Sequence, residues 1–208
     1  GGARIEWKQL IERDDNVRDF DMVGNDLYLI TASLPGRAIE RIRLPDGRRE
    51  VIVEGNADTP ISEGVFSVEG GLALRKDALY YITRAASGVG SRLHRLPHGQ
   101  DSPVEIPLPG LDDVSMLLPA QEGVTGLVVI GTGWTRFPEA WRIDADGNVH
   151  ASLLQPQPEG VDSSRLVSRV VQVPSHDGVE VPLSIVHRSG MARDGRNPTL
   201  LQGYGAYG

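Results

Sequence analysis

The residues best suited to chemistry are the last six, 203–208, which read Gly-Tyr-Gly-Ala-Tyr-Gly. Tyr204 carries a phenol that is neutral at pH 7, so it can donate a hydrogen bond to an anionic oxygen without first being charged. The glycines on either side allow the backbone to turn sharply and fix where the ring points. Tyr204 is therefore the first candidate for a hydrogen-bond donor to an oxyanion, and Tyr207 is the second.

The same glycines, 203, 205 and 208, also match the Gly-x-Gly-x-x-Gly pattern of dinucleotide-binding turns. That pattern requires a helix to receive the pyrophosphate and an acidic residue about 20 positions further on. The sequence ends at the last glycine, and two tyrosines would crowd the close approach of a phosphate. We therefore expect no cofactor, and a plain flexible turn remains open beside the donor role.

Two other groups of polar residues suggest sites but favour structural roles. Ser175, His176 and Asp177 are adjacent, and adjacent residues point apart, so they cannot align as nucleophile, base and orienting acid. His94 and His98 are four residues apart, a spacing that suits a metal only on a helix, and here a strand and its turn are expected. We expect no metal site, and no Gly-x-Ser-x-Gly nucleophile motif occurs in the sequence.

The elements that must position Tyr204 are strands. Two runs rich in β-branched residues, 167–173 and 179–186, flank an Asp-Gly pair, which predicts a β-hairpin. Residues 191–197 are polar and contain a second Asp-Gly, so they form a loop. Residues 198–202 read as a buried strand that leads directly into the glycine-tyrosine segment.

The preceding part of the chain repeats. Residues 27–31 (LYLIT) recur as 79–83 (LYYIT), an offset of 52, and more faintly as 127–132, a further 48 residues on. A period of about 50 residues built from short strands is typical of a four-stranded β-propeller blade. In the first unit we predict strands at 17–23, 27–32, 38–44 and 50–54.

The repeats add up to an arc of blades. Three full units are predicted at 17–55, 64–107 and 112–154, with an outer strand of an earlier blade at 5–11. The proline-rich run 155–160 is a linker by composition. Propellers close with about 4 to 8 blades, so three blades are part of a ring. The tryptophans are expected to pack within blades, and Trp134 to lie in a loop at a rim.

The order of hairpin, apolar strand, basic loop, short strand and glycine-tyrosine turn over 166–208 resembles the start of the catalytic domain in the prolyl oligopeptidase family of serine peptidases. The resemblance implies a mainly β chain: a partial β-propeller over 1–154, a linker over 155–165 and the opening strands of an α/β-hydrolase domain over 166–208. It matches Tyr204 to the tyrosine whose hydroxyl contributes to the oxyanion hole, and Tyr207 to an aromatic packing residue.

The same resemblance sets expectations for function. The nucleophile, acid and histidine of the family lie downstream of the glycine-tyrosine turn, so this chain alone is expected to be inactive. The parent would be a serine-type oligopeptidase that cleaves short peptides, because the propeller covers the active site. Residues that choose between cleavage after proline and after a basic residue would also lie downstream. A stand-alone propeller-like module that binds a protein or ligand is the alternative.

Composition bounds the partners. The 208 residues carry a formal charge of −7, which disfavours nucleic acid and anionic membranes as partners. The chain has no cysteine, which is compatible with a reducing cytoplasm, with the periplasm as the other possibility. Open strand edges at the ends of the arc favour pairing with another copy, or with the rest of the polypeptide.

Overall fold

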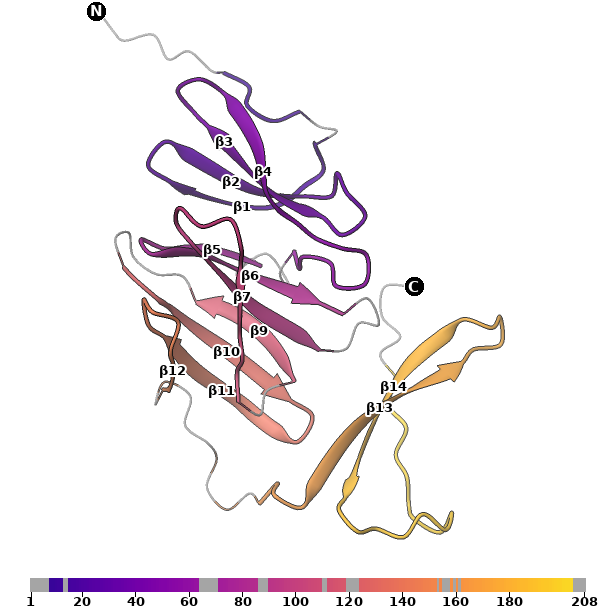
Figure 1. Cartoon of the computed structure of the whole chain (residues 1–208). Coiled ribbons are helices and arrows are strands. Elements are labelled where there is room, and N and C mark those ends of the chain that lie inside the picture. Colours follow the sequence, from indigo (N-terminus) through magenta and orange to yellow (C-terminus); the bar gives the residue numbers. More distant parts are fainter. Residues whose placement is uncertain are drawn as a thin grey trace, which may run out of the picture.

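The computed structural model describes residues 8–12, 15–63, 71–85, 90–109, 112–118, 124–152, 154, 158, 160 and 162–203, with side chains not described at 115, 116 and 118. Within these ranges every regular element is a β-strand, and all strands pair antiparallel. They form three four-stranded sheets that follow one another along a stack, and one two-stranded hairpin that projects from it (Figure 1). The mainly β prediction is confirmed.

Each four-stranded sheet is a meander in which consecutive strands are neighbours. The first contains β1 (Val17–Val23), β2 (Asp26–Thr31), β3 (Ala38–Arg43) and β4 (Arg48–Glu54). The second contains β5 (Leu72–Leu74), β6 (Ala78–Arg84), β7 (Ser91–Pro97) and β8 (Val104–Ile106). The third contains β9 (Asp113–Leu118), β10 (Leu127–Gly133), β11 (Arg136–Ile143) and β12 (Val149–Ala151).

The predicted strands of the first unit agree with this sheet to within two residues at each end. The predicted outer strand at 5–11 is not seen where it can be checked, because residues 8–11 form no strand and 1–7 lie outside the described residues. Residues 8–12 instead run beside the first sheet, where Ile11 packs against the cluster of Leu27, Leu29 and Ile42.

The sheets are held face to face by two apolar cores. Tyr28, Ile30 and Ile39 of the first sheet pack against Leu79 and Tyr81 of the second. On its other face the second sheet packs Tyr80, Ile82 and Leu93 against Val129 and Ile143 of the third. Fully burying one such side chain stabilises the fold by roughly 1.5–3 kcal/mol, so these two cores hold the stack together.

The hairpin consists of β13 (Leu166–Pro174) and β14 (Glu180–Arg188), which pair from Leu166↔Arg188 to Pro174↔Glu180. Its turn places Gly178 at φ 82°, the left-handed conformation that the Asp-Gly pair predicted. Figure 1 shows the hairpin standing apart from the stacked sheets, on the side of the β6–β7 and β10–β11 turns. Both of its faces therefore have large exposed areas.

The predicted buried strand at 198–202 is wrong for this structure. These residues form no strand, and Leu200 and Leu201 are 90% and 79% exposed. An apolar run becomes a buried strand only when a neighbouring strand pairs with it and another layer covers it, and no other strand of the described part of the chain does either. In all the residues that the structure describes, no helix is long and apolar enough to cross a membrane.

Candidate functional site

Tyr204, the candidate oxyanion donor, and Tyr207, its rival, lie outside the described residues, as does the whole of 204–208. The role of Tyr204 therefore stays a prediction. The structure does describe the backbone that leads to it, since residues 198–203 run on from the hairpin and all of them are exposed.

The tip of the hairpin confirms the turn interpretation of Ser175, His176 and Asp177. The Ser175 amide donates to Val179 O (2.8 Å), and the Gly178 amide donates to Ser175 O (3.0 Å). The Asp177 carboxylate accepts the Val179 amide (3.2 Å), so it caps its own turn instead of orienting the histidine. Ser175 Oγ lies 3.3 Å from His176 Nδ1, and this contact is exposed at the hairpin tip.

The two histidines four residues apart are not brought together. His94 Nε2 bonds Thr83 Oγ1 (2.8 Å), its ring stacks on Tyr81 at 4.9 Å, and burial lowers its pKa. His98 Nε2 instead donates to Arg75 O (2.7 Å). In the described ranges no three His, Cys, Asp or Glu side chains are grouped so that they could hold a metal ion.

The ends of the sheets on the hairpin side carry ion pairs. Arg37, in the β2–β3 turn, donates to Ile61 O (2.7 Å) and lies 3.4 Å from the Glu63 carboxylate. Arg84, at the end of β6, contacts Asp113 of β9 at 3.0 Å. These contacts link the first sheet to the segment that follows it and the second sheet to the third. They place paired charges at this end of the stack.

Two further contacts complete this end of the stack. Ser91 Oγ donates to Asp113 and accepts the Val114 amide (2.6 Å), which ties β7 to β9. Trp134 lies in the β10–β11 turn and is 59% exposed, as its predicted place in a rim loop requires. An exposed indole beside a polar surface is the kind of side chain that is enriched where proteins bind partners.

Between the first two sheets, the inner strands meet through carboxylates. Asp21 of β1 accepts the Leu74 amide of β5 at 2.9 Å. Asp19 lies on the same side of β1. Burial raises the pKa of its carboxyl group, and hydrogen bonds from the Phe20 and Leu72 amides only partly offset this rise. Two carboxylates two residues apart thus meet the unpaired edge of β5, a contact that no sequence motif announced.

A cavity of about 400 Å³ lies between the first two sheets and was not predicted. It opens at the β7–β8 turn, at the strand ends opposite the β2–β3 and β6–β7 turns. Its walls come from β2, β3, β4, β6, β7 and that turn, so no short stretch of sequence could signal it.

Comparison with known proteins by sequence finds peptidases, and no family model matches the chain. An 87-residue stretch is 32% identical to dipeptidyl aminopeptidase BI of Pseudoxanthomonas mexicana, covering 38% of this chain and 12% of that protein. A 46-residue stretch is 44% identical to the uncharacterized peptidase RP174 of Rickettsia prowazekii (strain Madrid E), covering 22% and 6%. The chain thus spans a small part of the length of these relatives.

Comparison by structure finds the same kind of enzyme. A prolyl endopeptidase superposes with a TM-score of 0.69 at 16% identity, over 85% of this chain and 25% of its own. Prolyl oligopeptidase B of Galerina marginata gives 0.66 at 14%, over 92% and 27%. Oligopeptidase B of Leishmania major gives 0.63 at 15%, over 85% and 25%. The resemblance to the prolyl oligopeptidase family is confirmed: this chain has the fold of about a quarter of these peptidases and shares a stretch of sequence with others.

Proposed function

We propose that this chain is part of a serine-type oligopeptidase, in which the stacked sheets are blades of a propeller that covers the active site. The observation that carries the proposal is the superposition of 85% of the chain on a prolyl endopeptidase, with a TM-score of 0.69. In this proposal residues 1–154 belong to the propeller, 155–165 cross between domains, and 166–208 begin the α/β-hydrolase domain.

The proposed chemistry is acyl transfer from a short peptide. An activated serine from the rest of the enzyme attacks the peptide carbonyl, and an acyl-enzyme forms and is hydrolysed. The Tyr204 hydroxyl, with a backbone amide beside the nucleophile, stabilises the negative oxygen of the tetrahedral intermediate. The chain of 208 residues holds only the tyrosine of this constellation, and it is inactive alone.

The exposure of the hairpin supports a larger domain around it. Val170 and Val173 are each 40% exposed, Val181 is 47% exposed, and the two leucines after the loop are almost fully exposed. Isolated two-stranded hairpins are marginal in water and gain stability from further strands or a covering layer. A hydrolase sheet that continues from 198–202 would supply that cover.

The experiment is Tyr204→Phe in the full-length parent enzyme, with Tyr207→Phe as the matched control. Removing one oxyanion donor costs roughly 10²–10³ in kcat, so Tyr204→Phe should lower kcat by about this factor and leave KM and thermal stability nearly unchanged. Tyr207→Phe should change kcat little. Full kcat in Tyr204→Phe, or a loss that only follows unfolding, would show that the turn is structural.

A further inference from the structure

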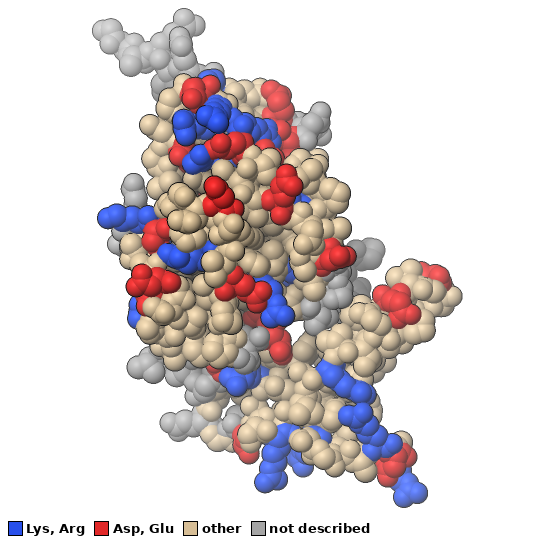
Figure 2. All heavy atoms as spheres, in the orientation of Figure 1, with Lys and Arg blue, Asp and Glu red and all other residues tan. Residues whose placement is uncertain are grey.

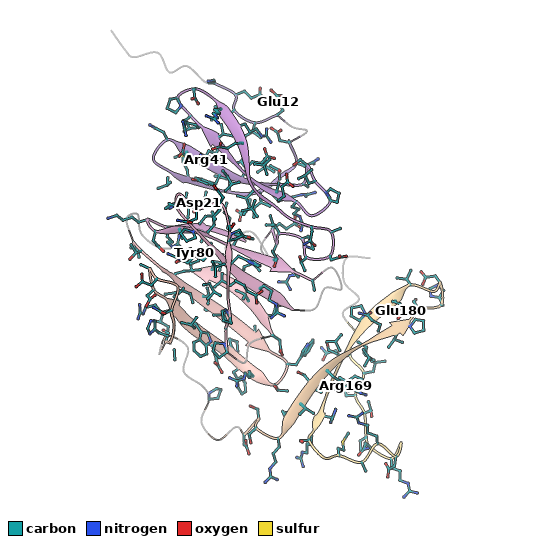
Figure 3. The ribbon with its side chains drawn as sticks, in the orientation of Figure 1. Glu12, Asp21, Arg41, Tyr80, Arg169 and Glu180 are labelled. Carbon is teal, nitrogen blue, oxygen red and sulfur yellow. The ribbon has the colours of Figure 1, made fainter. Side chains whose placement is uncertain are left out.

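The three sheets place an arginine at one equivalent position. Across the second and third strands, Tyr28 pairs with Arg41, Tyr80 with Arg95, and Val128 with Arg142. Tyr28 and Tyr80 belong to the cores that face the next sheet, and Figure 3 shows Arg41 and Tyr80 on successive sheets. The same cross-strand position can therefore be compared at two successive joints of the stack.

At the joint between the second and third sheets the arginine, Arg95, bridges the two sheets. We call this bridge from Arg95 to the next sheet the latch. Arg95 reaches across and donates to Ala145 O in the β11–β12 turn. It also donates to the Tyr80 hydroxyl (3.3 Å) and lies 3.4 Å from the Asp77 carboxylate. Ala145 stands two residues before Gly147, the turn glycine at φ 90°. A guanidinium thus occupies the space between one sheet and the turn of the next.

At the joint between the first and second sheets this latch is not made. Arg41 turns back to its own sheet, where Nε donates to Glu50 Oε1 (2.7 Å) and Nη2 donates to the same oxygen. This bond raises the pKa of Arg41 and lowers that of Glu50. Figure 2 shows basic and acidic side chains intermixed over the first sheet. The matching carbonyl is that of Pro97, two residues before Gly99 at φ 80°.

The cavity of about 400 Å³ lies where the latch would be, since Arg41 and Glu50 line one side and Pro97 to Asp101 the other. This volume is within the usual range for small-molecule pockets, roughly 300–1,000 Å³. Ile52, Leu79 and Leu96 give it apolar walls. Its size and lining fit a short hydrocarbon chain with one polar head.

The charges of the lining select the sign of that head. Arg41 is neutralised by Glu50, and Pro97 and Asp101 line the opposite wall. Pro97 O accepts the Gln100 amide (3.1 Å) and has a second lone pair for another donor, and the Asp101 carboxylate is a further acceptor. A cationic donor would be matched there, whereas an anion would meet a carboxylate. The neighbouring joint shows the chemistry that fits, because there a guanidinium on a three-carbon stem bonds the equivalent carbonyl.

We propose that the cavity between the first two sheets binds a small organic cation, an alkylguanidinium or alkylammonium group on a short hydrocarbon chain. The head group bonds Pro97 O and Asp101 in the place that Arg95 takes at the next joint, and the chain lies against Leu79 and Leu96. The site is at the strand ends opposite the β2–β3 and β6–β7 turns. It is independent of the proposed peptidase chemistry.

The test is a titration of the full chain, followed by the amide resonances of Gly99 and Gln100 in nuclear magnetic resonance spectra. n-Butylguanidinium should give saturable shifts of these amides with a dissociation constant on the order of 1 mM. Butyramide, which has the same chain without charge, should bind at least about tenfold more weakly, and butanoate should leave these amides unshifted. Equal effects of the three probes, or shifts with butanoate alone, would overturn the proposal.

Two variants test the residues. Asp101→Asn should weaken n-butylguanidinium binding by about tenfold through loss of a charge-assisted bond, whereas Asp58→Asn, an exposed acid away from the cavity, should leave it unchanged. Glu50→Gln frees Arg41 to reach Pro97 O, so the protein's own guanidinium should fill the site and abolish binding. Unchanged affinity in both Asp101→Asn and Glu50→Gln would refute this assignment.

Discussion

Asp77 holds the joint between the second and third sheets, and its removal is the sharpest test of how the stack is stabilised. The carboxylate accepts the Gly126 amide (2.7 Å) and the Tyr80 hydroxyl (2.8 Å), and it lies 3.4 Å from Arg95. Its side chain is only 10% exposed, and that of Arg95 is 13% exposed. Asp77→Ala would leave an amide, a buried phenol and a guanidinium without this acceptor.

The magnitude follows from these contacts. A hydrogen bond to a charged group contributes roughly 1.5–3 kcal/mol, and removing one partner of a buried ion pair costs roughly 3–5 kcal/mol. Asp77 accepts two such hydrogen bonds, so both estimates lead to a similar total. We therefore expect Asp77→Ala to lower the free energy of unfolding by about 3–5 kcal/mol. For a chain of this size that corresponds to a fall in Tm of roughly 6–20 °C.

Urea denaturation of the 208-residue chain and of Asp77→Ala measures this difference. Asp58→Ala is the control, because surface substitutions usually change stability by no more than about 0.5 kcal/mol. The double variant with Tyr80→Phe should lose less than the sum of the single losses, since both remove the same bond. A loss of less than about 1 kcal/mol of unfolding free energy in Asp77→Ala, or a double-variant loss equal to the sum of the two single losses, would refute the stabilising role of Asp77 at this joint.

Three other expectations concern acid, activity and assembly. Burial raises the pKa of Glu40, but the bonds from Arg49 and Thr31 outweigh it and the net pKa is lowered from 4.5; its stabilisation is therefore present above that value and lost as the pH falls through the depressed pKa. Denaturation midpoints should fall more steeply below about pH 5 for the unmodified chain than for Glu40→Gln, and parallel curves would contradict this. The 208-residue chain should not hydrolyse proline- or arginine-containing chromogenic peptides, and turnover blocked by a serine-directed inhibitor would disprove that. Light scattering should report a dimer or larger species, and a monomeric mass across micromolar concentrations would count against it.

The sequence was sufficient for the strands of the first sheet, because LYLIT and LYYIT mark the second strand of each unit and turn residues bound the rest. Pairing register was beyond it. The 52-residue offset aligns Arg43 with Arg95, yet the residue that pairs with the equivalent tyrosine in the first sheet is Arg41. The pairing register of the β2–β3 hairpin thus differs by two residues from that of the β6–β7 hairpin, although the two sequences repeat at an offset of 52 residues.

The candidate site was predictable only in part, for a physical reason. The Ser175 to Gly178 turn follows from local backbone preferences, and local preferences are visible in sequence. The contacts of Asp77 and the lining of the cavity beside Arg41 involve residues from different sheets, so both depend on how the sheets stack. For residues 198–202 the sequence predicted a buried strand that the structure does not form. Their apolar pattern requires a partner strand, and the described residues do not supply one.

The exposed apolar surface of the hairpin connects the proposed function with the expected self-association. Leu200 and Leu201 are 90% and 79% exposed, and valines of both hairpin strands are exposed as well, among them Val170, Val173 and Val181. Surface of this kind gains roughly 25 cal/mol per Å² when it is covered, whichever chain supplies the cover. In the parent enzyme we expect the hydrolase domain to cover it. In the 208-residue chain a second copy would do so, and adding the remaining part of the enzyme should therefore dissolve the dimer as it restores activity.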